Sequence, residues 1–437
     1  MKPFHLGWFL QGSSIQSWGH AWTGNIADEW MFPDFFIELT RSLERAKFDY
    51  VLLEDSSYVG ESWNNSREIY LKNGLSVPRQ DPSVVAALLA ARTSRIGIVP
   101  TLATFTHHPY LLARIIGSLD QVSRGRIGWN MVTGSSEFAA RNYGLDGLPE
   151  HDERYDRADE YMECVRGLWG SWQPGAIVND AESRTLIDHE KVNSIDFKGT
   201  YYASRGPLNS GPLPQGQPVI AQAGGSPRGR EFAARHADTI VASVRTVDAM
   251  RDYKADIVRR MEAQGRDPSE VKVLFLVSPV VGGTEEEARA EQRRRNERSD
   301  DALQQRLAFF GKITNIDFSK LPLDQPVPAD LKTNGHQQSL DEFKAFAAGK
   351  TLRQALAAYD AAGGGTIDLI GTPEQVALRM TEVMEQVGGD GFLFSFANTN
   401  RRTVAEVADG LVPALQRLGA VRTAYSHDHF RDNLLAF

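Results

Sequence analysis

Short apolar runs that alternate with amphipathic helical patterns run through most of this 437-residue sequence. Eight such runs occupy residues 4–10, 50–54, 96–102, 127–133, 218–223, 239–244, 273–281 and 391–396. Several are apolar at every position, which is typical of parallel strands covered on both faces. Eight strands interleaved with helices is the number that closes a (β/α)8 barrel. We therefore predict an α/β fold, a TIM barrel with long insertions.

Two segments interrupt the alternation. Residues 171–217 are rich in turn-forming residues, and their alternating stretch IDFKGTYY suggests a small hairpin. Residues 296–366 contain the Pro-rich polar connector DFSKLPLDQPVPADLKTNGHQQS between helical patterns. Loops of this length in a compact domain usually act as lids or binding segments. We expect one domain, residues 1–437, with insertions at about 171–217 and 296–366.

The composition excludes several classes of protein. With 41% apolar and 24% charged residues, the chain can build a large core. A net charge of −8 without a basic run argues against nucleic acid or a membrane surface as the main partner. The only cysteine, Cys164, lies in a helical pattern and fits a reducing compartment. The apolar patch at the N-terminus is too short for a signal or membrane segment, so we expect a cytoplasmic protein that binds a small molecule.

The stretch AQAGGSPRG, residues 221–229, places a bare polar turn between a predicted strand and a predicted helix. Gly224 and Gly225 allow close approach of the backbone, Ser226 can cap the helix, and Pro227 suits its first position. The free N–H groups of such a helix start attract an anion, and Arg228 lies nearby, as does Arg230. An ordinary capped helix would show the same pattern.

Polar residues end several other predicted strands. They are Glu54, Asp55, Thr101, Thr104, Asn130 and Thr133. Asn and Thr side chains can hydrogen-bond a neutral heterocycle or an oxygen species without adding charge. A metal site would need converging carboxylates or histidines, so we expect no metal. His107 and His108 are sequence neighbours, and we interpret them as loop or packing residues.

A helical pattern begins with HDERYDRADEY, in which His151 and Tyr155 are four residues apart. Their side chains therefore share one face, where they could donate to a phosphate or a ribityl hydroxyl. A surface histidine beside a half-buried tyrosine is the alternative. Trp8, Phe9 and Trp63 could line an apolar substrate pocket or belong to the core, and for Trp8 we favour the core.

Several common motifs are missing from the sequence. We find no GxGxxG after a strand, no GxxxxGK[ST], no HExxH and no GxSxG. No lysine ends a predicted barrel strand, which weighs against a Schiff-base aldolase.

The motifs in combination resemble a known family. FHLGWFL, LLEDSS, IGIVPTLATFTHHPY, GRIGWNMVTGSSEFAARNYGL, HDERYDRADEY, AQAGGSPRGREFAARHAD, TNGHQQS and GTPEQVAL occur in an order similar to that of the bacterial-luciferase-like flavin monooxygenases. The nearest subgroup is that of nitrilotriacetate, dibenzothiophene sulfone and long-chain alkane monooxygenases. The resemblance spans almost the whole chain and implies a (β/α)8 barrel that uses FMNH2 delivered by a separate NAD(P)H:flavin reductase.

The resemblance also implies roles for individual residues. The implied FMN contacts are Asp55, Thr101, Asn130, His151, Tyr155, Gly225 and Ser226. Asn130 and Thr101 resemble the pair beside the reactive edge of the flavin, where O2 is activated. His336 resembles a histidine that alkane-oxidising members place over the substrate, although a solvated loop histidine is equally compatible with the sequence.

These implications together predict a two-component FMNH2-dependent monooxygenase that uses O2 to oxygenate a small organic substrate, with C–S or C–N cleavage plausible by analogy. Family members commonly form dimers and tetramers, so we expect a homo-oligomer. Two alternatives stay open. One is a luciferase-like oxidoreductase that uses a deazaflavin for hydride transfer, and the other is a flavin-binding protein without turnover.

Overall fold

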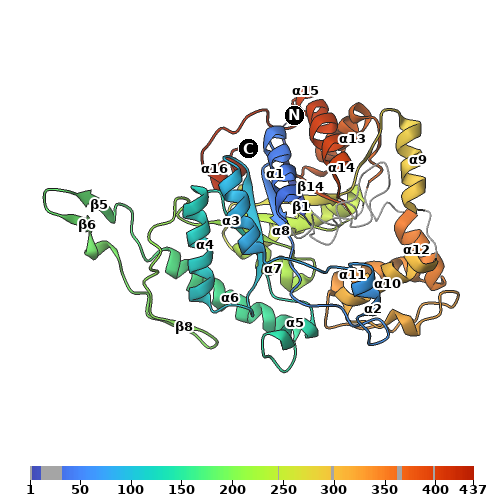
Figure 1. The fold of residues 1–437 in the computed structure, drawn as a ribbon, viewed down its shortest axis with the longest axis horizontal. Helices are drawn as coiled ribbons and strands as arrows, with labels where there is room; N and C mark the ends of the chain where they lie inside the picture. Colours follow the sequence, from blue (N-terminus) through green and yellow to red (C-terminus); the bar gives the residue numbers. More distant parts are fainter. Residues whose placement is uncertain (1, 11–31, 245, 297–299, 362–366, 397–398) are drawn as a thin grey trace.

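The computed structural model of the chain describes residues 2–10, 32–244, 246–296, 300–361, 367–396 and 399–437. Its centre is a closed barrel of eight parallel strands in the order β1-β14-β11-β10-β9-β4-β3-β2 (Figure 1). The strands are β1 (His5–Leu10), β2 (Tyr50–Leu53), β3 (Gly97–Ala103), β4 (Gly128–Val132), β9 (Val219–Gln222), β10 (Thr239–Ala242), β11 (Lys272–Val277) and β14 (Gly391–Ser395). Each of the eight predicted runs forms one of them, which confirms the predicted barrel.

Helices surround the barrel and fill the connections between strands. They are α1 (Asp34–Ala46), α2 (Glu68–Lys72), α3 (Pro82–Arg92), α4 (Pro109–Ser123), α5 (Glu137–Asn142), α6 (His151–Trp169), α7 (Pro227–His236), α8 (Val247–Ala263), α9 (Glu285–Asn296), α10 (Asp300–Thr314), α11 (Gln337–Ala347), α12 (Leu352–Ala361), α13 (Pro373–Val387), α14 (Arg401–Ala405), α15 (Val412–Arg417) and α16 (Phe430–Leu434). Among the described residues, no helix combines the length and apolar character needed to cross a bilayer.

Side chains of alternate residues fill the inside of the barrel. The buried interior cluster contains Tyr50, Leu52, Val99, Val219, Ala221, Val241, Leu274, Leu393, Phe430 and Leu434. Because side chains alternate between the two faces of a strand, Thr101, two residues after Val99, points to the same interior. Trp8 faces the other way and is fully buried against Phe48 and Phe394, which confirms its assignment to the core.

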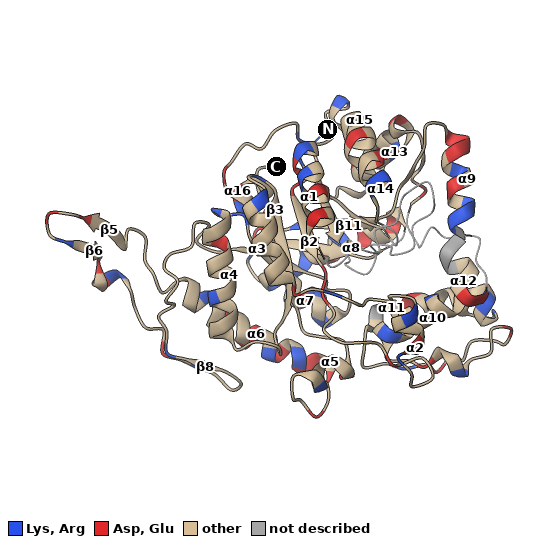
Figure 2. Ribbon diagram, viewed as in Figure 1, with Lys and Arg blue, Asp and Glu red and all other residues tan. Residues whose placement is uncertain are grey.

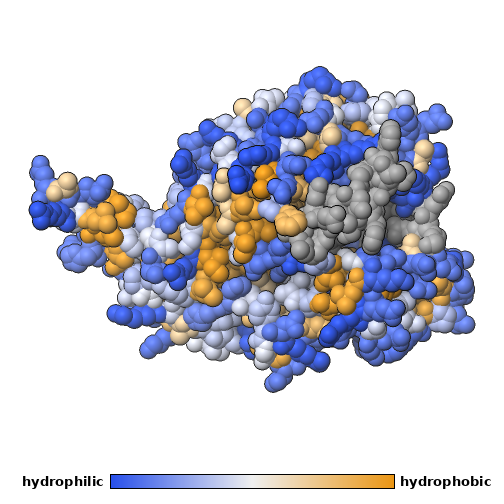
Figure 3. Space-filling view, in the orientation of Figure 1, coloured by the Kyte–Doolittle hydropathy of each residue, from blue (hydrophilic) through white to orange (hydrophobic). Residues whose placement is uncertain are grey.

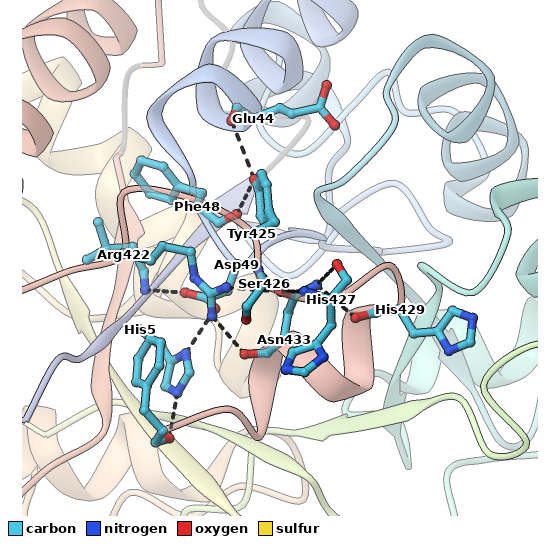
Figure 4. A network of polar contacts seen from close by, with 12 residues as sticks. His5, Glu44, Phe48, Asp49, Arg422, Tyr425, Ser426, His427, His429 and Asn433 are labelled. Carbon is cyan, nitrogen blue, oxygen red and sulfur yellow. Dashed lines mark hydrogen bonds and ion pairs between the residues drawn. The ribbon is translucent and has the colours of Figure 1, made fainter.

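The N-terminal end of the barrel is closed by α16. A Cβ atom on Gly97 of β3 would lie 2.6 Å from the Phe430 ring of α16, so β3 and α16 are in close contact. A buried polar network holds the C-terminal segment in place (Figure 4). Arg422 Nη2 donates to Asp49 Oδ1 at 2.6 Å, and His5 Nδ1 lies 2.9 Å from the same oxygen. Burial opposes ionisation of Asp49, but His5 and Arg422 outweigh it and lower its pKa.

The first interruption, residues 171–217, contains two antiparallel hairpins. The strands β5 (Ile177–Asp180) and β6 (Thr185–Ile187) form an arm that projects away from the barrel (Figure 1). The predicted hairpin is confirmed as β7 (Phe197–Lys198) paired with β8 (Ala203–Ser204). All four residues of β5 are exposed, and Ile177, Val178 and Leu186 give the arm an apolar surface (Figure 3).

The second interruption contains α10, α11 and α12, which share a core of their own around Phe310, Phe318 and Phe343. Trp63, in the loop between β2 and α2, packs against this core. The preceding helix, α9, carries acidic residues in its first turn and basic residues in its last turn (Figure 2), as the helix dipole favours. The boundaries of the expected insertion near 297–299 and 362–366 lie outside the described residues. A short parallel pair, β12 (Val280–Val281) and β13 (Ile370–Gly371), joins the segments that flank it.

Candidate active site

Thr101 and Asn130 lie side by side on the inner wall of the barrel. They are register partners on β3 and β4, and Asn130 Nδ2 donates to Thr101 Oγ1 at 2.8 Å. Each residue is 4% exposed. Asn130 Oδ1 is buried and has no hydrogen-bond partner among the described residues. A buried acceptor without a partner is costly, so this atom is suited to a ligand donor.

The turn after β9 opens at the same end of the barrel. Ala221 on β9 is the register partner of Asn130 on β4, and β9 ends one residue later, at Gln222. The turn that follows therefore begins beside the Thr101–Asn130 pair. Ser226 caps α7, its Oγ accepting the Gly229 N–H at 3.0 Å, and Pro227 occupies the first helical turn, as predicted.

Two glycines allow close packing around the start of α7. A Cβ atom on Gly224 would lie 2.4 Å from the Gly229 carbonyl oxygen, so the turn packs directly on α7. A Cβ atom on Gly229 would lie 2.7 Å from the Tyr155 hydroxyl, so a larger residue there would push α7 away from α6. Gly225 lies between Gly224 and the cap, and its carbonyl accepts a hydrogen bond from Arg230 Nε at 3.0 Å.

The first turn of α6 meets the Ser226 cap. Ser226 Oγ lies 3.2 Å from His151 Nε2, and His151 Nδ1 donates to Asp152 Oδ1 at 2.7 Å. The rings of His151 and Tyr155 lie 5.2 Å apart, so the predicted shared face is present. Burial raises the pKa of Tyr155, partly offset by hydrogen bonds that include Gln222 and Ser226. The phenol is therefore a neutral donor near pH 7.

Neither arginine of the turn is free to bind an anion, unlike the expectation from the sequence. Arg228 Nη2 donates to Asp159 Oδ2 at 2.6 Å and to Asp156 Oδ1 at 2.9 Å. Arg230 Nη1 donates to Asp256 Oδ2 at 3.2 Å. These aspartates belong to α6 and α8, so the ion pairs hold α7 against both helices. An anion here would depend on backbone N–H groups, the cap and α6.

Asp55 follows β2 at the same end of the barrel. Burial raises its pKa to about 6, although the charge of Arg79 opposes the shift. Glu54, its neighbour, forms an ion pair with Arg79. The Asp55 carboxyl therefore changes its protonation state close to neutral pH, as groups in binding sites often do.

His336 starts α11 in the second insertion and faces the first turn of α6. Its Nδ1 accepts the Ser339 N–H at 3.3 Å, so the neutral ring carries its proton on Nε2. The residue is exposed, yet the surrounding protein lowers the pKa of its imidazole, with a further contribution from the charge of His151. Asn334 Nδ2 holds the segment by donating to the Leu148 carbonyl at 3.3 Å.

The remaining sequence candidates have local roles. His108 caps α4 by accepting the Tyr110 N–H, and His107 Nδ1 contacts Thr106 Oγ1 at 2.6 Å. Phe9 packs against the interior cluster at the mouth. Within the described parts of the chain, no three His, Cys, Asp or Glu residues converge as metal ligands would.

A cavity of ≈ 290 Å³ lies beside the ends of β3 and β4. Its polar lining includes Thr104, Thr133, Arg154 and Arg157, and Leu148 contributes apolar surface. This volume is near the lower limit for small-molecule sites.

Two site residues were not predicted from the sequence. Gln222, the last residue of β9, contacts Tyr155, and its buried Oε1 has no partner in the described structure. Its position at a strand end is the signal that could have revealed it. Lys312 of α10 is buried beside the Asp55 loop, and the sequence near it, AFFGKIT, resembles any amphipathic helix.

The fold and site define a (β/α)8 barrel enzyme with one polar mouth built from loops far apart in sequence. The family described as luciferase-like monooxygenase matches residues 8–391, and the chain belongs to this family. It is 33% identical over 440 residues to dibenzothiophene-sulfone monooxygenase of Rhodococcus erythropolis (strain XP), covering 99% of this chain and 96% of the relative.

Two further similarities bear on the chemistry. Component A of nitrilotriacetate monooxygenase from Aminobacter aminovorans is 32% identical, with 99% of this chain and 96% of the relative covered. The solved structure of a riboflavin lyase with modified FMN and riboflavin superimposes with a TM-score of 0.89 at 32% identity, covering 100% of this chain and 96% of that one. Enzymes similar over their full length therefore include one solved with a flavin.

Proposed function

We propose that the protein is a two-component monooxygenase that uses FMNH2 and O2 to transfer one oxygen atom to a small organic molecule. The observation that carries the proposal is Asn130 Oδ1, a buried acceptor without a described partner on the inner wall of the barrel. It lies at the same mouth as the Ser226–His151 contact. One extended ligand with an anionic tail and a polar ring could satisfy both ends.

The residues present fit FMN at the phosphate end. Ser226, His151 and Tyr155 offer three side-chain groups around the N-terminus of α7, whose free N–H groups favour an anion. The glycines at 224 and 229 keep the backbone close to this point, and Gly225 extends the same turn. Asp55 would accept a hydrogen bond from a flavin N–H or hydroxyl when it is ionised.

At the proposed site of oxygen activation, Asn130 and Thr101 have different hydrogen-bonding roles. Since Asn130 Nδ2 already donates to Thr101 Oγ1, the Thr101 hydroxyl proton is free to point to a reacting oxygen, and Asn130 Oδ1 is free to accept. Reduced FMN, when bound, would supply the electrons that activate O2. The insertion that carries His336 would exclude water, and Nε2–H of the neutral ring could donate a proton.

The proposal includes a separate NAD(P)H:flavin reductase as partner. The similarity to a protein named component A of nitrilotriacetate monooxygenase supports it, because that name implies a second component. Cleavage of a C–S or C–N bond is the proposed outcome, since the similar enzymes are named for a sulfone and for a tertiary amine.

We also propose a single barrel domain, residues 1–437, with insertions at about 171–217 and 296–366, that forms a cytoplasmic homodimer or homotetramer. The arm of β5 and β6 supports oligomerisation, because a two-stranded hairpin with exposed Ile177 and Leu186 gains stability when it is covered. The free thiol of Cys164 is buried, which suits a reducing compartment.

Oxygen consumption tests the proposed activity. The full-length protein is mixed with FMN, NADH and a flavin reductase, and oxygen uptake and oxygenated products are measured with sulfone and amine substrates. A monooxygenase gives product in proportion to oxygen consumed. A deazaflavin-dependent enzyme would ignore FMNH2 and reduce or oxidise substrate without oxygen. A flavin-binding protein without turnover would retain oxidised FMN and give no product with any substrate.

A further inference from the structure

Lys312 is a lysine of the second insertion that lies buried at the barrel mouth. Only 3% of the residue is exposed, and its Nζ donates to Ser56 Oγ at 2.6 Å. The same Nζ lies 4.6 Å from the centre of the Tyr58 ring, and the Tyr58 hydroxyl donates to the Lys312 carbonyl at 3.0 Å. The side chain and the main chain of one residue of α10 therefore bind one loop, residues 54–58.

Charged groups surround this lysine from two other segments. Glu54 and Asp55 precede Ser56 on the loop, and Arg79 comes from the segment before α3 and pairs with Glu54. When Lys312, Arg79, Glu54 and Asp55 are all ionised, their charges sum to zero. Lys312 Nζ contacts the Ser56 hydroxyl and the Tyr58 ring face directly, and neither group carries a full negative charge. Burial lowers the pKa of Lys312 to about 7, and Arg79 adds to the shift.

Three other contacts between the insertion and the mouth are insensitive to pH near neutrality. The Tyr70 hydroxyl donates to the Ala308 carbonyl at 3.0 Å, and Asn315 Nδ2 donates to the Ser135 carbonyl at 3.1 Å. Asp317 accepts the Asn64 N–H at 3.0 Å, and its pKa is lowered despite burial because Ser319 also donates to it. Among these contacts, only the one made by Lys312 changes charge close to pH 7.

We propose that Lys312 is a positioning residue whose ammonium group holds the Asp55 loop, the proposed flavin-binding loop, against the insertion. Loss of the ammonium charge removes its attraction to Glu54 and Asp55 and weakens its hydrogen bond to Ser56. The loop and α10 then separate more often. The inference rests on the proposed function only where it calls the loop flavin-binding.

Hydrogen exchange of the full-length protein tests the positioning role of Lys312 without any ligand. Exchange of residues 54–58 and α10 is compared at about pH 6 and about pH 8.5, on either side of the lysine pKa, after correction for intrinsic rates. In the wild type we expect about tenfold faster exchange at the higher pH, the scale of one hydrogen bond from a charged group. Lys312→Arg stays ionised and should exchange slowly at both values. Lys312→Met should exchange fast at both.

Lys332→Met is the matched control, because Lys332 belongs to the same insertion but is exposed. It should behave as the wild type does. An identical pH dependence in wild type and Lys312→Arg would overturn the proposal, since another group would then be responsible. The comparison of wild type with Lys312→Arg tests the proposal even if Lys312→Met fails to fold.

FMN titration separates this inference from the proposed function. At about pH 6, Lys312→Met should bind FMN about tenfold more weakly than the wild type. At about pH 8.5 the wild type should bind as weakly as Lys312→Met, whereas Lys312→Arg should bind about tenfold more tightly than either. If neither wild type nor variants bind FMN while the exchange results hold, the proposed function fails and the positioning role stands. Equal FMN affinity in wild type and Lys312→Met at about pH 6, where the lysine is charged, would show that the lysine does not position the flavin loop.

Discussion

Ser226 and His151 begin neighbouring helices, and their side chains meet at 3.2 Å between Oγ and Nε2. The contact defines a chain of hydrogen bonds. His151 donates from Nδ1 to Asp152, so the neutral ring accepts the Ser226 hydroxyl proton at Nε2, while Ser226 Oγ accepts the Gly229 N–H. When His151 is protonated, the direction of the Ser226 bond reverses. Only in the second arrangement, where Nε2–H donates to Ser226 Oγ, is the Ser226 hydroxyl proton free to donate to an anion.

Replacing Ser226 by Ala should weaken binding of reduced FMN by about 1–2 kcal/mol, the scale of one hydrogen bond to a charged group. The variant also loses the α7 cap, which costs about 0.5–2 kcal/mol of unfolding free energy. Titration of the protein with FMNH2 under anaerobic conditions measures the first effect, and urea unfolding measures the second.

Thr246→Ala provides the matched control for Ser226→Ala. Thr246 caps α8 by accepting the Ala249 N–H at 3.2 Å, as Ser226 caps α7. Thr246→Ala should lose similar stability but bind FMNH2 as the wild type does. Unchanged FMNH2 affinity in Ser226→Ala would remove this serine from the cofactor site.

Thr101→Val should destabilise the protein more than its size suggests. The substitution is nearly isosteric but leaves Asn130 Nδ2 buried without its acceptor, which costs about 1–3 kcal/mol of unfolding free energy. Thr101→Ser keeps the oxygen and should retain most of the stability. Urea unfolding compares the three proteins. In the oxygen assay Thr101→Val should also form less product per O2 consumed, and wild-type stability and yield together would contradict the assigned pairing.

The barrel could be predicted because each strand carries its own signal. Runs such as IGIVPTL are apolar on both faces, and this pattern depends only on neighbouring residues. The arm of β5 and β6 could not be predicted in the same way. All four residues of β5 are exposed, so no core imposes an alternating pattern on them.

Residues of the site were predictable when their role depended on local geometry or on the family resemblance. Ser226 could be assigned as a cap from its position before Pro227 alone. The environment of Arg228 could not, because its partners Asp156 and Asp159 lie about 70 residues earlier on α6. Lys312 was missed for the same reason, since its burial depends on Ser56, far away in sequence.

The affinity for FMN should depend on pH through Asp55. Its pKa is raised to about 6, so the carboxylate that can accept a hydrogen bond predominates only above that value. Oxidised FMN should therefore bind more tightly as the pH rises from 5 to 7, by at most about tenfold per pH unit for one proton. Asp55→Asn, which is neutral throughout, should bind with little change over this range. Fluorescence titration measures both proteins, and parallel pH profiles would exclude Asp55 as the titrating group.

His336→Ala should lower the yield of product per O2 more than it lowers FMN affinity. The proposed role of the imidazole is to donate a proton from Nε2–H, while its Nδ1 caps α11 by accepting the Ser339 N–H. Alanine removes both functions, so a loss of yield alone could reflect a disordered helix start.

His336→Asn distinguishes the two roles of this histidine. The amide oxygen can replace Nδ1 as the cap acceptor, but asparagine cannot provide the Nε2–H donor on an aromatic ring. If His336 acts on the substrate, both variants should release more hydrogen peroxide and form less product, whereas only His336→Ala should lose helix stability. Peroxide and product are measured in the same reaction mixture. Wild-type coupling in both variants would identify His336 as a capping residue of the insertion without a part in oxygen transfer.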